Sequence, residues 1–131
     1  MDERDRYEQG MAIRREAFGD AYVDRGLAKR NAFNAELQDL IARYAFGEIW
    51  SRPGLPRHTR SLITMAMLLA LHRDEELRLH VRAALRIGVT RDELKELLLQ
   101  SAVYCGISAA HSGFRLVEET LAAVDAECAP K

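Results

Sequence analysis

The chain has 131 residues, of which 48% are hydrophobic and 30% are charged, so it is too apolar to be disordered. Nineteen lysines and arginines against twenty acidic residues give a formal net charge of -1, which argues against general binding to nucleic acid or to membrane surfaces. The length supports one domain over residues 1–131, because two separately cored domains would each be small.

Hydrophobic periodicity, with no alternating run typical of a strand, predicts an all-α fold. The first helix stops before Gly19, and the second ends at a turn that contains Pro53, Gly54 and Pro56. The third is apolar nearly all round at its centre, so we expect its own domain or a partner subunit to surround it. The six expected helices cover approximately residues 2–18, 34–50, 58–73, 74–87, 90–106 and 108–127.

Local capping signals set the boundaries of the last three helices. Gly88 stands at a C-cap position after the fourth helix. Thr90 and Glu93 have the spacing of a capping box at the start of the fifth, and Ser108 can cap the sixth. We expect Cys105, on the apolar face of the fifth helix, to be a small core residue.

The cysteines and the chain's first residues indicate a reduced, cytoplasmic protein. Cys105 and Cys128 form neither a disulfide framework nor a Cys-x-x-Cys pair. The charged first residues are not followed by an apolar signal segment, and the longest nearly apolar run, residues 61–71, is about half of what a bilayer span needs. We therefore expect no membrane association.

Residues 49–73 contain no acidic side chain. Guanidinium groups gathered there could bind the carboxylates of a ligand in a bidentate manner. They could equally pair with acids of other helices or of a neighbouring subunit. Both interpretations remain open from the residues alone. The basic side chains of this acid-free segment are Arg52, Arg57, Arg60, Arg73, His58 and His72.

Glu76 and His80 lie four residues apart on the fourth helix, beside the apolar stripe that contains Leu77 and Val81. A carboxylate beside an imidazole raises the pKa of the histidine and orients its ring, which would give a proton donor near neutral pH. The alternative is an ordinary helical Glu–His pair at a contact between helices or subunits. His111 opens the last helix and is expected only to help its packing.

Motifs for other chemistry are absent from the sequence. No two histidines have a chelating spacing of four, so no metal site is expected. There is no nucleophile elbow, phosphate-binding loop or dinucleotide fingerprint.

The segments that carry a family resemblance cover nearly the whole chain and are residues 7–20, 33–41, 47–55, 57–63, 75–84, 88–93 and 99–106. Together they resemble the 4-carboxymuconolactone decarboxylases, within the wider superfamily of alkylhydroperoxidase D-like proteins. The resemblance implies an all-α fold whose subunits usually associate into trimers or hexamers.

The chain departs from the peroxidase relatives at their reactive motif. Those relatives carry Cys-x-x-Cys followed by a histidine, whereas this chain has Arg73 and Glu76 at the cysteine positions and His80 at the histidine position. Ser61 stands where the redox members have a glutamate. Disulfide exchange cannot run there without the two thiols, so the departure favours the decarboxylase branch.

The resemblance implies loss of CO2 from 4-carboxymuconolactone to give 3-oxoadipate enol-lactone, in protocatechuate degradation through the β-ketoadipate pathway and without a cofactor. The partners would be the small dianionic lactone and further copies of the chain. His80 would act as hydrogen-bond donor or general acid with Glu76 orienting it. A thiol-dependent peroxidase-like protein and a noncatalytic helical oligomer remain the alternatives. The expected carboxylate anchors are Arg52, Arg57, Arg60 and Arg73.

Overall fold

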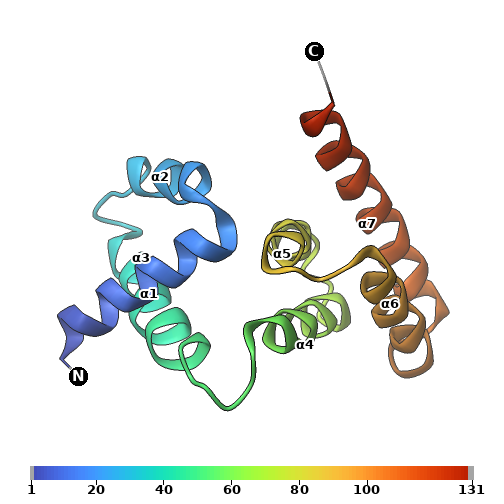
Figure 1. The fold of residues 1–131 in the computed structure, drawn as a ribbon, viewed down its shortest axis with the longest axis horizontal. Coiled ribbons are helices and arrows are strands. Elements are labelled where there is room, and N and C mark those ends of the chain that lie inside the picture. The colour runs from blue at the N-terminus through green and yellow to red at the C-terminus, as the bar shows by residue number, and fades with distance from the viewer. Residues whose placement is uncertain (1, 130–131) are drawn as a thin grey trace. The chain divides into compact units, whose positions relative to one another are not determined.

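A computed structural model describes residues 2–129, and over this range it contains only helices, turns and loops (Figure 1). The all-α class expected from the sequence is thereby confirmed. The chain divides into two compact units, residues 1–57 and 58–131. The single domain over residues 1–131 stays a prediction. No helix within the described range is long and apolar enough to cross a membrane.

The first unit begins with α1 (Glu3–Phe18), which starts where the Asp2 carboxylate accepts a hydrogen bond from the Asp5 N–H. It ends at Gly19, whose φ of 87° suits a residue without a side chain. The next helix, α2 (Asp20–Ala28), was not expected from the sequence. The Arg15 guanidinium pairs with both Asp20 and Asp24, at 3.0 and 2.9 Å, and so ties this short helix to α1.

The helix expected over residues 34–50 consists of two parts. It begins as α3 (Ala35–Leu40) and continues as the π-helix η1 (Ile41–Trp50). Helix η1 packs on α1 at two glycines: a Cβ on Gly10 would lie 1.7 Å from the Ala42 carbonyl oxygen, and one on Gly47 would lie 2.3 Å from the Arg6 carbonyl oxygen. The two backbones therefore touch, and neither glycine leaves room for a methyl group.

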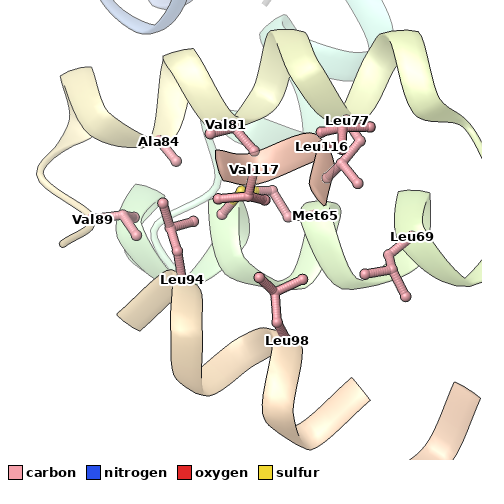
Figure 2. Close-up of a cluster of buried hydrophobic side chains, with 10 residues drawn as sticks. All are labelled: Met65, Leu69, Leu77, Val81, Ala84, Val89, Leu94, Leu98, Leu116 and Val117. Carbon is pink, nitrogen blue, oxygen red and sulfur yellow. The ribbon is translucent and has the colours of Figure 1, made fainter. Parts of the chain in front are cut away.

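The second unit contains α4 (Arg57–Ala70, beginning at the unit boundary), α5 (Asp74–Ile87), α6 (Arg91–Cys105) and α7 (Ile107–Cys128). Figure 2 shows aliphatic side chains of these helices meeting in one core. Two ion pairs, Arg78–Glu119 at 3.0 Å and Arg82–Glu127 at 2.9 Å, join the outer face of α5 to α7. The core consists of Met65, Leu69, Leu77, Val81, Ala84, Val89, Leu94, Leu98, Leu116 and Val117.

Two of the three predicted caps in this unit are confirmed. Gly88 ends α5 in the left-handed conformation, with φ of 108°. Both capping-box bonds form, from the Glu93 N–H to the Thr90 hydroxyl at 3.1 Å and from the Thr90 N–H to the Glu93 carboxylate at 2.9 Å. The Ser108 cap is wrong, because α7 starts one residue earlier, after Gly106. Cys105 is also not a core residue, because it is exposed at the end of α6.

Helix α4 is covered by its own unit on one face. Ser61, Met65 and Leu69 are buried, as expected for a helix that packs on α5, α6 and α7. Met67 is 59% exposed and Leu71 is 65% exposed. The second unit by itself therefore leaves one side of this apolar helix exposed, and what covers that side stays a prediction.

Candidate functional site

The four arginines predicted to bind carboxylates are divided between the two units. Arg52 and Arg57 belong to the first unit, and Arg60 and Arg73 belong to the second. Arg52 and Arg73 are exposed, whereas Arg60 is partly buried in the first turns of α4. The Arg57 guanidinium pairs with the Glu16 carboxylate of α1. For Arg57, the structure therefore shows the pairing with another helix that was one of the two interpretations.

His58 of the acid-free segment is held by an acid from α6. Its Nε2 lies 2.8 Å from Glu93 Oε2, while Glu93 Oε1 accepts the capping bond from the Thr90 N–H. The hydrogen bond from the Thr90 backbone and, after it, the one from His58 hold the pKa of Glu93 below its ordinary value. This carboxylate thus joins the start of α4 to the start of α6, which is a structural role.

Glu76 and His80 lie one turn apart on α5, as the spacing predicts. Glu76 is exposed and His80 is partly buried. The neighbours of His80 on the same helix, Leu77 and Val81, belong to the aliphatic core, where they point toward α4 and α7 (Figure 2). The imidazole thus lies at the edge of an apolar core, with a carboxylate one turn before it.

The expected rise in the pKa of His80 is wrong in its net direction. Burial disfavours the imidazolium and lowers the pKa of His80 below 6.5, and the opposing attraction of the Glu76 carboxylate is smaller. His80 is therefore predominantly neutral at neutral pH. A neutral imidazole still has one N–H donor and one acceptor nitrogen, so it can donate a hydrogen bond to a developing oxyanion.

Ser61 of α4 is the most deeply buried polar side chain of the second unit. Its hydroxyl has no hydrogen-bond partner among residues 2–129, and the residue has no exposed surface. The sequence pointed to this position only through the resemblance, as the place of a glutamate in redox relatives. A buried hydroxyl here costs desolvation energy that an apolar residue would not.

Sequence reasoning missed Arg14 on α1. The only signal was its position on the helix face that also carries Tyr7, Met11 and Phe18. Its guanidinium lies over the Phe46 ring, with the guanidinium carbon 5.9 Å from the ring centroid. As for metals, no group of three His, Cys, Asp or Glu side chains able to hold an ion occurs in the described part of the chain.

The fold and the α5 pair define a small all-helical protein with a neutral imidazole at the edge of its core and no cysteine pair at that site. Residues 35–119 match the carboxymuconolactone decarboxylase family. The chain belongs to this family, as the resemblance indicated.

Two relatives named as decarboxylases are similar to most of the chain, and a third is similar to a shorter part of it. A 4-carboxymuconolactone decarboxylase from Acinetobacter baylyi is 51% identical over 119 residues, which are 91% of this chain and 89% of the relative. A nitrosuccinic acid decarboxylase from Metarhizium robertsii is 35% identical over 115 residues, 88% of this chain and 80% of the relative. A 48-residue sequence of a 4-carboxymuconolactone decarboxylase from Pseudomonas putida matches over its whole length with 54% identity, covering 37% of this chain.

Proposed function

We propose that this protein is a carboxy-lyase that converts 4-carboxymuconolactone into 3-oxoadipate enol-lactone and CO2, in protocatechuate breakdown. The observation that carries the proposal is the 51% identity over 91% of the chain to a relative with that activity. Two relatives named as decarboxylases of different carboxylic acids support the reaction type independently of the substrate.

The proposed substrate supplies its own electron sink. Its departing carboxylate is bonded to a ring carbon that is conjugated, through a double bond, to the lactone carbonyl. When the C–C bond breaks, its electron pair passes into that carbonyl as a dienolate, and CO2 leaves. A proton then adds to the ring carbon α to the carbonyl. The protein must bind the dianion, stabilise the developing oxyanion and allow that protonation.

His80 suits the second of these tasks because burial keeps its imidazole neutral. A neutral N–H aimed at the lactone oxygen becomes a stronger interaction as negative charge grows there. Glu76, one turn before it, would orient the ring and favour the imidazolium if His80 also delivers the proton. The apolar core beside His80 would exclude water from the reacting carboxylate.

The carboxylates of the substrate require cationic anchors, and the four arginines predicted from the sequence are proposed for this role. They differ in burial and in position. Arg60 is partly buried on the same helix as Ser61, and Arg73 directly precedes α5. Arg57 would first have to exchange its Glu16 partner for the substrate. Arg52 is a further, exposed candidate.

The proposal includes a homo-oligomer, a trimer or hexamer, in the cytoplasm. Ile63 and Met67 of α4 and Leu71, directly after its end, are spaced four residues apart and form an apolar stripe that is exposed in a single chain. A second copy packed on this stripe would remove it from water, as symmetric oligomers commonly do.

The test is turnover of freshly prepared 4-carboxymuconolactone by the purified protein, followed by ultraviolet absorbance and CO2 release. We expect His80→Ala to lower turnover by roughly 10²- to 10⁴-fold, the usual contribution of a positioned donor or acid. The matched control is His111→Ala on α7, which removes an exposed imidazole and should leave turnover within about twofold.

Three outcomes would contradict the proposal. Near-wild-type turnover by folded His80→Ala would remove His80 from the chemistry. Absence of turnover by the folded wild-type oligomer would point to a noncatalytic assembly. Peroxide consumption abolished by thiol alkylation would point instead to Cys105 or Cys128, both exposed.

A further inference from the structure

Arg14, in the middle of α1, is partly buried against aromatic and sulfur groups. Its guanidinium carbon lies 5.9 Å from the centroid of the Phe46 ring. Its Nη1 donates a long hydrogen bond of 3.9 Å to Met11 Sδ, and its Nε is buried without an acceptor among residues 2–129. A guanidinium carries five N–H donors, and a thioether is a weak acceptor. The strong acceptors that this group can bind are therefore not supplied by the described protein.

The other partly buried arginines of residues 2–57 all bind carboxylates. Arg15, the next residue along the chain, contacts Asp20 and Asp24 at 3.0 and 2.9 Å. Arg14 forms no ion pair with any described residue. This difference does not come from a shortage of acids, because the same unit supplies carboxylates to its neighbours. The remaining pairs are Arg6 with Glu3 and Glu48, Arg43 with Glu3, and Arg57 with Glu16.

An arginine that is partly withdrawn from water without an anion carries a desolvation cost in the folded unit. Burial lowers the pKa of Arg14, although Tyr22 and Tyr7 nearby oppose the shift. The face of Phe46 offsets part of this desolvation through its attraction for a cation. A bound carboxylate would offset the rest, because charge-assisted bonds to a guanidinium are among the strongest in proteins.

Arg14 lies beside a cluster of aromatic rings. Phe46 packs against Phe18 and Trp50, each with ring centroids 5.6 Å apart, and Phe18 packs against Tyr22 at the same separation. Phe46 and Trp50 belong to η1, and π-helical turns occur frequently at functional sites. The cation and the rings together favour an unsaturated organic acid.

We propose that Arg14 binds a carboxylate of a small, flat organic acid, at a site formed within the first unit by α1 and η1. The acids named for the two relatives, 4-carboxymuconolactone and nitrosuccinic acid, both belong to the carboxylate class. The binding does not depend on the His80 chemistry, because a guanidinium binds a carboxylate whether or not it reacts. Arg14 is thus a binding residue that the acid-free segment did not indicate.

The test is equilibrium binding of muconate, a planar dicarboxylate with no lactone ring to decarboxylate. Trp50 is the one tryptophan in the sequence and stacks near Phe46, so its fluorescence reports on this cluster. We expect a saturable change with muconate and none with its dimethyl ester. Arg14→Met should weaken muconate binding about tenfold or more, and Arg14→Lys by several-fold, because lysine lacks the planar fork. Arg15→Met, the matched control, should remain within about twofold.

The proposal is overturned if the folded wild-type protein does not bind muconate, if the ester binds equally, or if folded Arg14→Met binds like the wild type. It is also overturned if Arg14→Met changes the oligomer mass without changing muconate affinity, because the carboxylate would then come from a second copy. Arg14→Lys keeps the positive charge and serves as the test if Arg14→Met does not fold. If Arg14→Lys binds muconate as tightly as the wild type, bidentate binding of the carboxylate by Arg14 is wrong. Muconate binding without lactone turnover would contradict only the proposed function.

Discussion

The two units hold their helices together in different ways. In the first, α1 and η1 touch through backbone at Gly10 and Gly47, and these two helices are also joined by an ion pair and by an edge-to-face contact between aromatic rings. In the second, four helices share an aliphatic core, and the glycine of α7, Gly113, faces the side-chain ends of Leu69 and Leu98. A backbone atom cannot turn away from an added group, whereas a leucine methyl can.

The two units also differ in the charge of their partly buried basic side chain. The first keeps Arg14 charged over an aromatic ring, since a guanidinium cannot give up its proton in a protein. The second keeps His80 neutral, because an imidazole can release its proton when burial disfavours the charge. A partly buried arginine without an ion pair therefore points to an anion that binds it, and a partly buried histidine points to a neutral donor or acceptor.

Gly10→Ala should have the largest effect on stability. The new Cβ would meet the Ala42 carbonyl oxygen at 1.7 Å and the Gly47 nitrogen at 2.9 Å, so α1 and η1 would have to separate. We expect a loss of more than about 4 kcal/mol of unfolding free energy, beyond the usual range for one substitution. Urea unfolding followed by Trp50 fluorescence measures the first unit, which contains this tryptophan.

The matched control is Gly26→Ala in α2, where a Cβ meets no atom within 4 Å. This variant should be more stable than the wild type by about 0.5–1 kcal/mol, because alanine loses less entropy than glycine in a helix. Equal stability of the two alanine variants would show that the close contact between α1 and η1 does not hold the first unit together.

Gly113→Ala tests the softer contact of the second unit. Its Cβ would lie 2.6 Å from Leu69 Cδ1 and 2.9 Å from Leu98 Cδ2, both at the ends of flexible side chains. We expect a cost of about 1–2 kcal/mol, since overpacking is partly offset by the better helix propensity of alanine. Thermal unfolding followed by circular dichroism measures it.

A double-mutant cycle with Leu98→Ala gives the control for Gly113→Ala. Removing the Leu98 methyl groups should reduce the cost of the added methyl, because one of its two contacts disappears. If Gly113→Ala costs as much as Gly10→Ala, the distinction between backbone and side-chain contacts would be wrong.

Most of the second unit could be predicted from the sequence because its signals are local. Three of these signals depend on residues within one or two turns of each other. They are the apolar periodicity of α5, the Gly88 cap and the Thr90–Glu93 capping box. In the first unit, α2 was missed because Arg15 stabilises it from a different helix, through Asp20 and Asp24. A pattern of local periodicity does not contain such a contact.

The candidate site shows the same limit. The spacing of Glu76 and His80 could be read directly, whereas the direction of the His80 pKa shift depends on burial, which follows from packing against other helices. The acid-free run drew attention to Arg57, yet its partner, Glu16, lies 41 residues away in sequence. Arg14 forms no ion pair with a described residue, and a sequence does not show which charges lack an oppositely charged partner.

The smallest expected effect is a pH dependence of stability that follows from His80. Its pKa is below 6.5 in the folded protein because of burial, so the unfolded chain takes up a proton first as the pH falls. Stability should therefore be full above about pH 6.5 and decline toward the folded pKa, with more protons bound in the unfolded state throughout this window.

Urea unfolding between pH 7.5 and 5 measures this pH dependence. Over this range the unfolding free energy of the wild type should fall more than that of His80→Gln. The His58–Glu93 pair is present in both proteins, so its contribution cancels in the difference. The carboxylates with lowered pKa, among them Glu93 and Glu127, lose their stabilisation below about pH 4.5, outside the window. Glu76→Gln removes the attraction that opposes burial, so it should extend the decline to lower pH. Identical slopes in wild type and His80→Gln would mean that the imidazole is as well hydrated in the folded protein as in the unfolded chain, and the neutral donor proposed for catalysis would lose its physical basis.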